Sequence, residues 1–444
     1  MRKNKVLMLV TAFAPDSIIA AVRPSMFARY LTEQGYEVTI VRSGRIDGRA
    51  DDVMWTHVKN LRIFSYEGNE CAAEKYSRGE GGENMSPLQD SPHFRFIQNP
   101  VLRRFLHILY DPFRYIRYAL TERKKIKVVI DSQLKGESFD VVYATYGDVA
   151  NVLVSDYAAK VFGSKLIIDL RDAMCVQLQS CLLRMVTTFL ERKYLQKADV
   201  VTCVTEGLTQ DMKKIVGEKA VLLYNGYMPQ ESHVLQKSNA DSCTEKEALT
   251  LFYGGNMYGG RRDFSALFSA INELVLENKI DLTHIRFVYA GASFEVVRSQ
   301  AEKYGVEEIL ENRGYVSRSE SDRLQCQSDI FLVATWNTKK EQGIMTGKFY
   351  ESIRNCMPII AVVTGDKSDS EIGKIINQYG LGACYEQANH EYTYVLLKEY
   401  LEKKYRNKIE KGEVEYLPKD GATQKFSYKY LSAQMAEIIE SVVS

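Results

Sequence analysis

Short apolar runs recur along the chain and are separated by amphipathic stretches. Runs of this length, rich in Val, Ile and Leu, are typical of strands that are buried on both faces of a parallel sheet. The amphipathic stretches between them predict crossover helices, so the expected fold class is α/β. The predicted strands cover residues 5–11, 37–41, 139–144, 165–170, 199–205 and 220–226, and then 249–255, 285–291, 329–334 and 359–364.

The strands fall into two series, which predicts two domains in a chain of 444 residues. Residues 1–229 form the first predicted domain and residues 248–426 the second, joined by a polar linker over 230–247, and residues 427–444 have helical spacing. The first domain opens as strand, loop, helix and strand, with Pro24 placed as the first helical residue and Gly35 as the stop. This Rossmann-like start lacks G-x-G-x-x-G, so no dinucleotide is expected there.

Composition narrows the classes of partner and cofactor. The 58 basic and 57 acidic residues nearly cancel, so no global field attracts nucleic acid. Eight scattered cysteines without a C-x-x-C pair predict a reduced, cytoplasmic protein, and neither a secretory signal nor a membrane-spanning run is apparent. The six histidines show no ligand spacing and there is no Asp-x-Asp, so we expect neither a metal nor a cofactor.

An excursion over residues 66–125 interrupts the first strand series. Its first part, up to residue 100, is rich in Gly, Ser, Glu and Asn and is predicted to be flexible. Residues 101–125 carry seven Arg or Lys against Asp111 and Glu122, interleaved with aromatic residues. Such a stretch is typical of contact with an anionic membrane surface, here the inner face of the cytoplasmic membrane. The alternative is a pair of helices packed on the domain with their arginines outward.

The strongest candidate for chemistry lies between the predicted strands at 329–334 and 359–364. A helix of about three turns is predicted to open at Thr346 and Gly347, with Lys348 and Glu351 one turn apart on one face. A helix N-terminus at the carboxyl edge of a parallel sheet binds phosphate, a lysine adds countercharge, and a carboxylate accepts from ribose hydroxyls. The alternative is an ordinary solvated Lys–Glu pair.

The string MTGKFYESIRNCMPIIAVV resembles the donor-site helix of the retaining glycosyltransferases of family 4. The resemblance implies a GT-B fold, in which two Rossmann-like domains face each other across a cleft and the last helix returns to the first domain. It implies that Glu351 holds the ribose and that Glu341 positions a sugar hydroxyl. The two glutamates stand ten positions apart here, which is wider than in the family.

The resemblance also implies a hexosyltransferase-type reaction without a metal. A sugar would move from a nucleoside diphosphate to a glycan or lipid-linked acceptor with retained anomeric configuration, in the assembly of bacterial surface polysaccharide. The leaving phosphate would take the acceptor proton, so no protein nucleophile is required.

Further donor-binding residues are expected in two loops. The loop NMYGGRRD follows Gly255 and begins at Asn256, and its Arg261 and Arg262 can grip a diphosphate. We expect Arg262 to be the catalytic member of this pair together with Lys348, because the adjacent Asp263 can orient it; a solvated basic turn is the alternative. The segment NRGYVS resembles the family's base pocket, where the resemblance places Tyr315 and Val316, and a simple edge strand is the alternative.

Acceptor contacts are expected at loops of the first domain. The resemblance places Arg23 opposite the acceptor, although this residue can equally flank a helix N-terminus. Two predicted strands end in Tyr146-Gly147 and in Arg171-Asp172, and parallel strands present their carboxyl ends on one side. Asp172 can accept from an acceptor hydroxyl, or the Arg171-Asp172 pair can cap a helix. A nucleotide-sugar epimerase or hydrolase and a non-catalytic binding protein remain alternative functions.

Overall fold

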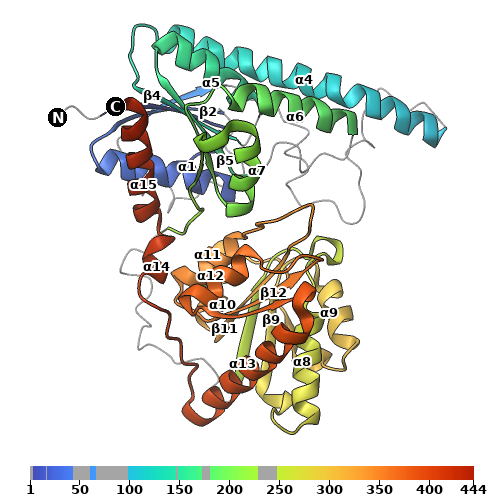
Figure 1. Ribbon diagram of the computed structural model, residues 1–444. Coiled ribbons are helices and arrows are strands. Elements are labelled where there is room, and N and C mark those ends of the chain that lie inside the picture. The colour runs from blue at the N-terminus through green and yellow to red at the C-terminus, as the bar shows by residue number, and fades with distance from the viewer. Residues whose placement is uncertain are drawn as a thin grey trace. The chain divides into compact units, whose positions relative to one another are not determined.

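The computed structural model describes residues 4–16, 18–43, 61–66, 99–146, 149–172, 181–228 and 248–444. The chain forms two compact units (Figure 1). One consists of Met1–Tyr224 together with Tyr428–Ser444, and the other is Asn225–Ser427. The predicted linker at 230–247 and most of the predicted flexible stretch, residues 67–98, lie outside the described residues.

A seven-stranded parallel sheet forms the centre of the N-terminal unit, in the order β3-β2-β1-β4-β5-β6-β7. The strands are β1 (Lys5–Val10), β2 (Glu37–Ser43), β3 (Arg62–Tyr66), β4 (Val141–Tyr146), β5 (Lys165–Leu170), β6 (Val200–Cys203) and β7 (Ala220–Leu222). The helices are α1 (Ile19–Glu33), α4 (Pro100–Gln133), α5 (Val149–Phe162), α6 (Cys181–Leu195), α7 (Glu206–Val216), the 3-10 turn η2 (Gly217–Lys219) and α15 (Tyr428–Val443).

Helices cover both faces of this sheet because side chains alternate along each strand. Val142 and Ala144 of β4 belong to the apolar cluster that includes residues of α4 and α5. Tyr143 points the other way, and its ring packs edge-on against Phe27 of α1 at 6.3 Å between centroids. Phe27 also packs edge-on against Tyr428, the first residue of α15, and α1 and α15 lie side by side in Figure 1. The predicted return of the last helix to the first domain is confirmed.

Helix α1 begins earlier than predicted. It starts at Ile19, so Pro24 lies inside the helix and not at its first position. Proline has no N–H, which leaves the carbonyl four residues before it without its helical partner. That carbonyl belongs to Ala20, and it accepts a hydrogen bond of 3.0 Å from Nη1 of Arg171. A distant side chain therefore replaces the missing helical bond, which the local sequence does not reveal.

Helix α4 is one continuous helix of 34 residues and not the pair of helices of the packed alternative. Its second half enters the core of the unit through Ile126, Val129 and Ile130. Nearer the middle of the helix, Phe113 and Leu120 are exposed. Among the described residues, no helix is both long enough and apolar enough to cross a membrane.

The C-terminal unit repeats the same strand order in a six-stranded parallel sheet, β10-β9-β8-β11-β12-β13. Its strands are β8 (Leu249–Gly254), β9 (Ile285–Ala290), β10 (Leu310–Asn312), β11 (Ile330–Trp336), β12 (Ile359–Thr364) and β13 (Gly382–Glu386). Its helices are α8 (Ser265–Leu276), α9 (Phe294–Glu302), α10 (Arg318–Cys326), α11 (Gly347–Arg354), α12 (Glu371–Tyr379), α13 (His390–Lys411) and α14 (Ala422–Lys425), with 3-10 turns η3 (Tyr258–Gly260), η4 (Leu282–His284), η5 (Glu307–Ile309) and η6 (Gln387–Asn389).

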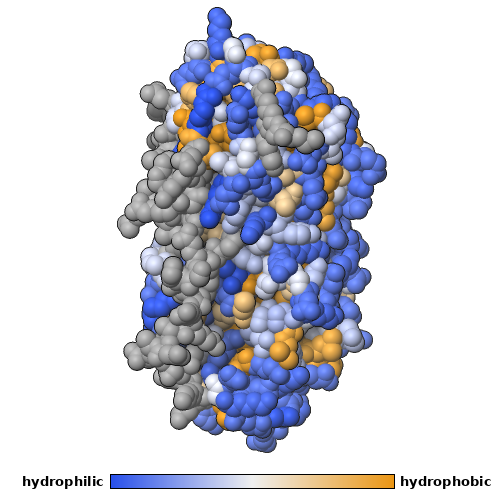
Figure 2. All heavy atoms as spheres, turned by 90° about the vertical axis from the view of Figure 1, so that its left-hand side faces the viewer, coloured by the Kyte–Doolittle hydropathy of each residue, from blue (hydrophilic) through white to orange (hydrophobic). Residues whose placement is uncertain are grey.

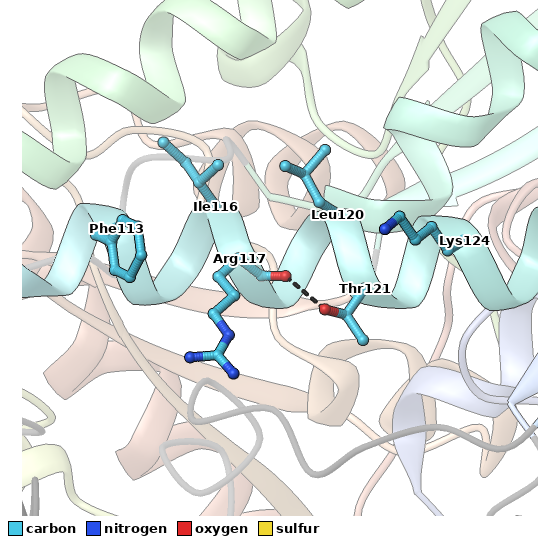
Figure 3. A pocket seen from close by; sticks show the side chains of 6 residues that line it. All are labelled: Phe113, Ile116, Arg117, Leu120, Thr121 and Lys124. Atoms are coloured by element: carbon cyan, nitrogen blue, oxygen red, sulfur yellow. Dashed lines mark hydrogen bonds between the residues drawn. The ribbon is translucent and has the colours of Figure 1, made fainter.

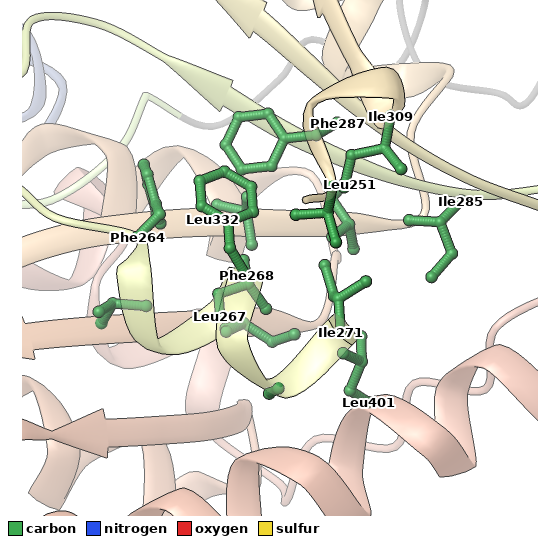
Figure 4. Close-up of a cluster of buried hydrophobic side chains, with 14 of the residues drawn as sticks. Leu251, Phe264, Leu267, Phe268, Ile271, Ile285, Phe287, Ile309, Leu332 and Leu401 are labelled. Carbon is green, nitrogen blue, oxygen red and sulfur yellow. The ribbon is translucent and has the colours of Figure 1, made fainter. Parts of the chain in front are cut away.

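The core of this unit lies between one face of its sheet and helices α8 and α13 (Figure 4). Leu251 of β8 and Phe287 of β9 meet Phe268 of α8 and Leu401 of α13 in one buried cluster. Each such side chain contributes about 1.5–3 kcal/mol by leaving water.

On the face drawn in Figure 2, hydrophilic residues predominate and hydrophobic ones form small groups. The rigid sheet holds the loops at its carboxyl edge.

Candidate functional site

The candidate donor residues gather at one point of the C-terminal sheet. Strands β8 and β11 are neighbours, although β8 is followed in the chain by β9 on its other side. Ligands of such sheets bind outside the carboxyl ends of the strands at this change of direction. The loop after β8 and the loop between β11 and α11 carry seven of the predicted residues: Gly255, Asn256, Arg261, Arg262, Glu341, Thr346 and, at the start of α11, Gly347. Lys348 follows in the first turn of α11.

The side chain of Lys348 lies directly against the backbone of Gly255. A Cβ atom at position 255 would stand 2.5 Å from Cε and 2.6 Å from Nζ of Lys348. Gly255 also has φ +139°, a conformation that other residues rarely adopt. Glycine at this position therefore lets the lysine cross the end of β8 and reach the loop that follows it.

The ammonium of Lys348 has no counterion at bonding distance among the described residues. No hydrogen bond or ion pair joins Nζ to the residues the structure describes, and its nearest aromatic ring, Tyr253, lies 6.0 Å away. Burial lowers the pKa of Lys348; the Glu351 carboxylate opposes this effect and the Arg262 guanidinium adds to it. A half-buried lysine with a cation nearby is poised to attract an anion.

Arg262 is the second basic group at this point and is only 7% exposed. Its Nη1 donates to the Tyr253 hydroxyl at 3.1 Å and to the Asn256 carbonyl at 3.0 Å, and its Cζ lies 4.5 Å from the centre of the Tyr258 ring. Its Nε is buried without a hydrogen bond, and no carboxylate in the described part of the chain pairs with it. The expected orienting role of Asp263 is not seen, because its carboxylate accepts from the backbone N–H of Ser265.

Thr346 is the N-cap of α11, as predicted, but its hydroxyl does not cap the helix. Its Oγ1 is buried and has no hydrogen-bond partner. A buried hydroxyl without a partner costs about 1–3 kcal/mol, so this group is suited to a ligand. Glu351, also half-buried, follows one turn into the helix. The helix itself has eight residues and ends two turns in, because Cys356 adopts φ +51°, which is shorter than the predicted three turns.

Glu341 has two protein partners of its own. Its Oε2 accepts a hydrogen bond of 2.7 Å from Nε1 of Trp336 and forms an ion pair with Nη2 of Arg261. The Arg261 guanidinium lies over the Trp336 ring, 4.1 Å from its centre. Arg261 thus pairs with Glu341, whereas the sequence predicts that it binds the diphosphate.

Tyr315 and Val316 lie beyond the end of β10, two strands away from β8. Tyr315 is 91% exposed, and Val316 is half-buried. The structure places this segment at the same edge of the sheet as the other donor candidates. Its assignment to a base pocket stays a prediction.

Arg23 of the N-terminal unit is buried and fully engaged by protein groups. It is 1% exposed and forms an ion pair of 2.8 Å with Asp169. Its Nη1 donates to the Tyr224 carbonyl and its Nη2 to the Leu223 carbonyl at 2.9 Å. This arrangement leaves no exposed guanidinium atom for an acceptor and assigns Arg23 a structural role.

Asp169 is the residue that the sequence analysis missed. Burial alone would raise its pKa, but Arg23 and hydroxyl donors on Thr202 and Tyr143 outweigh burial and lower it. The two hydroxyls donate at 2.6 and 2.8 Å. A lone aspartate inside the apolar run KLIIDL was the signal, because a buried carboxylate needs a cationic partner.

Of the remaining acceptor candidates, the structure describes Arg171, Asp172 and Tyr146. Arg171 supports α1 through Ala20, while its Nε is buried without a partner. Asp172 is exposed and Tyr146 is half-buried at the end of β4. Gly147 lies outside the described residues. In the part of the chain that is described, no group of three or more His, Cys, Asp or Glu residues has metal-binding geometry.

No protein-family profile and no curated protein sequence matches this chain. Solved structures do match it. HepE from Anabaena in complex with UDP and glucose is 12% identical and aligns with a TM-score of 0.55 over 99% of this chain and 100% of that chain. The catalytic domain of starch synthase IV from Arabidopsis thaliana, bound to ADP and acarbose, is 13% identical with a TM-score of 0.56 over 99% of both chains. A proposed UDP-N-acetylglucosamine 2-epimerase from Listeria monocytogenes is 12% identical with a TM-score of 0.51, over 99% of this chain and 96% of that one.

These likenesses extend over nearly the whole chain and define its fold. Two parallel sheets of seven and six strands, each with flanking helices, form the GT-B type of α/β architecture. The fold class predicted from the sequence is confirmed.

Proposed function

We propose that the chain is a glycosyltransferase that takes its sugar from a nucleoside diphosphate. The observation that carries this proposal is the pair of basic side chains, Arg262 and Lys348, that converge without a carboxylate partner at bonding distance among the described residues. Two cations without a directly bonded carboxylate among the described residues, together with the Thr346 hydroxyl and the first turn of α11, match the charge and hydrogen-bonding needs of a diphosphate. The neighbours HepE and starch synthase IV were solved with UDP and ADP, which supports a nucleotide at this fold.

In the proposed reaction, the bond between the anomeric carbon and the diphosphate oxygen breaks and a bond from that carbon to an acceptor hydroxyl forms. The acceptor proton passes to the leaving phosphate oxygen, and attack on the same face retains the anomeric configuration. Arg262 and Lys348 stabilise the charge that develops on the diphosphate, a form of catalysis that often provides the largest share of rate enhancement. Glu351 would hold the ribose. We propose that no metal is required, since the two cations supply the countercharge.

We propose a glycan or lipid-linked acceptor, as in the assembly of bacterial surface polysaccharide, and contact with an anionic membrane surface through α4. Figure 3 shows a shallow hollow on α4 lined by Phe113, Ile116, Leu120 and, beside them, Arg117 and Lys124. Exposed apolar side chains flanked by basic ones suit a lipid headgroup layer. Sedimentation with vesicles of phosphatidylserine and phosphatidylcholine tests this contact. We expect Leu120→Glu to weaken it and the same change at exposed Val128, beyond the basic stretch, to weaken it less.

The activity is tested by offering radiolabelled UDP-glucose, UDP-N-acetylglucosamine, GDP-mannose and ADP-glucose together with a bacterial membrane extract. We expect transfer of label from one donor, unchanged by EDTA, and at least tenfold slower transfer by Lys348→Met. Absence of transfer with every donor and extract, although a diphosphate binds, would favour a non-catalytic binding protein.

The likeness to a proposed UDP-N-acetylglucosamine 2-epimerase supports a second candidate function. An epimerase or a hydrolase acts on the donor without an acceptor. Proton NMR of UDP-N-acetylglucosamine incubated with the chain alone separates these reactions, because an epimerase changes the configuration at a ring carbon and a hydrolase releases free sugar. The transferase proposal predicts neither product at a rate comparable to transfer.

A further inference from the structure

One oxygen of the Glu341 carboxylate, Oε2, makes all of its contacts with the described part of the chain. Trp336 donates its Nε1–H to Oε2 at 2.7 Å, and Arg261 forms its ion pair with the same atom. The other oxygen, Oε1, accepts no hydrogen bond from the described part of the chain. The carboxylate is therefore anchored through Oε2, while Oε1 is not hydrogen-bonded by any residue that the structure describes.

The two partners of Glu341 also hold each other. The Arg261 guanidinium lies 4.1 Å from the centre of the Trp336 ring, and the Tyr258 ring packs edge-on against Trp336 at 5.9 Å. The backbone of Glu341 is fixed as well, since its N–H donates to the Thr338 hydroxyl at 3.0 Å. Three segments, the loop after β8, the end of β11 and the loop before α11, thus meet around one carboxylate. We call Arg261, Trp336 and Glu341 the carboxylate brace.

An ionised carboxylate oxygen can only accept, so a ligand group that hydrogen-bonds to Oε1 must bring a hydroxyl or an N–H. Resting on the proposed function, we propose that Arg261 and Trp336 are positioning residues that orient Glu341 so that Oε1 accepts from a hydroxyl of the transferred sugar. The brace then contributes to recognition of the sugar and not of the nucleotide. It also replaces the expected role of Arg261 at the diphosphate, which is left to Arg262 and Lys348.

The test separates the sugar's share of donor binding from the nucleotide's share. Trp336→Phe keeps an aromatic ring beside Arg261 but removes the indole N–H together with the five-membered ring, while Arg261→Lys keeps the charge and removes the flat stacking surface. For each variant, calorimetry measures dissociation constants for UDP, GDP or ADP, whichever binds the wild-type chain, and for its glucose, N-acetylglucosamine or mannose conjugate. We expect the affinity for the conjugate to fall about tenfold in Trp336→Phe and in Glu341→Gln, with the affinity for the free diphosphate unchanged.

Arg298→Ala is the matched control, because Arg298 pairs with Glu302 on the exposed face of α9. It should change neither constant. Equal losses for conjugate and free diphosphate would overturn the inference by showing that the brace merely supports the loop, and so would unchanged constants in all three brace variants. If Trp336→Phe melts at a much lower temperature than the wild-type chain, the dissociation constants of Arg261→Lys and Glu341→Gln are used to test the inference instead. If the wild-type chain binds none of the diphosphates, the proposed function and this inference are both overturned. If the wild-type chain binds a diphosphate but the variants keep full affinity for the sugar conjugate, only this inference is overturned.

Discussion

Arg23 in the N-terminal unit and Arg262 in the C-terminal unit are buried arginines with opposite surroundings. The guanidinium of Arg23 meets the Asp169 carboxylate and two backbone carbonyls, so its charge is neutralised within the protein. Arg262 donates to a tyrosine hydroxyl and one carbonyl, keeps a buried Nε without a partner, and lies near the second cation, Lys348. The first arrangement is satisfied within the protein, whereas the second suits the diphosphate site that we propose.

This contrast distinguishes a structural charge from a functional one. A buried ion pair holds the fold, and breaking it leaves an uncompensated charge. A buried cation without its partner lowers the stability of the ligand-free protein and is retained where binding requires it.

Arg23→Met should destabilise the chain strongly. The substitution leaves the Asp169 carboxylate buried without its cation, which typically costs about 3–5 kcal/mol. Urea unfolding at neutral pH measures the loss. Arg29→Met, which removes the half-buried partner of exposed Glu33 on the same helix, should cost under about 0.5 kcal/mol. Similar losses for both variants would show that the Arg23 network is not what holds this part of the unit.

Lys348→Met should weaken binding of the preferred nucleoside diphosphate by about 2–3 kcal/mol, a loss of roughly 30- to 150-fold, because a charge-assisted contact to phosphate is removed. Isothermal titration of wild-type and variant chains measures the difference. Lys348→Arg keeps the charge and should retain part of the affinity. If Lys348→Met binds the diphosphate with wild-type affinity, Lys348 does not contribute to the binding site.

Diphosphate affinity should fall as the pH rises through the lowered pKa of Lys348, below the ordinary value of 10.5. The bound anion favours the ammonium form, which is lost in that range. Ligand-free stability should change in the opposite direction, because the unfolded lysine still binds a proton there and the folded one does not. Lys348→Arg should show a flatter profile, since a guanidinium stays protonated. Parallel profiles for the two chains would contradict this assignment.

Thr346→Val should have the smallest effect, about 1 kcal/mol on diphosphate affinity, without reducing ligand-free stability. The substitution removes a buried hydroxyl that has no partner and keeps the shape of the side chain. Thr209→Val is the control: the Thr209 hydroxyl is buried and donates to the Thr205 carbonyl at 2.7 Å, so its loss should reduce stability by about 1 kcal/mol. Calorimetry and thermal unfolding of both variants provide the comparison.

The sequence predicts the buried strands well and the edges less well. Strands β5 and β12 have the bounds expected from their continuous apolar runs, because strands buried on both faces need no alternation. Edge strands β3 and β13, RIFSY and GACYE, were not predicted, since short edge strands carry polar residues and a weak pattern. The start of α1 was misplaced because Pro24 is tolerated inside the helix only through a contact with Arg171, far away in the chain.

The candidate site was predictable where chemistry is local and unpredictable where it depends on contacts across the sequence. Thr346, Lys348 and Glu351 share one helix start, which the pattern around position 347 indicates directly. The partner of Arg23 lies 146 residues away, and Arg261 pairs with Glu341, which lies 80 residues further along the chain. Such pairings follow from the strand order, which spacing alone does not define.

The most direct test of the central claim compares two lysines of the same unit. Lys408 is buried and paired with Asp329 at 2.9 Å, whereas Lys348 has no such partner among the described residues. Urea unfolding of Lys408→Met and Lys348→Met, each without ligand, measures what each charge contributes to stability. We expect a loss of about 3–5 kcal/mol for Lys408→Met and no loss for Lys348→Met. Equal losses of unfolding free energy in the two variants would contradict this expectation, because Lys348 would then be a structural residue and not part of an anion-binding site.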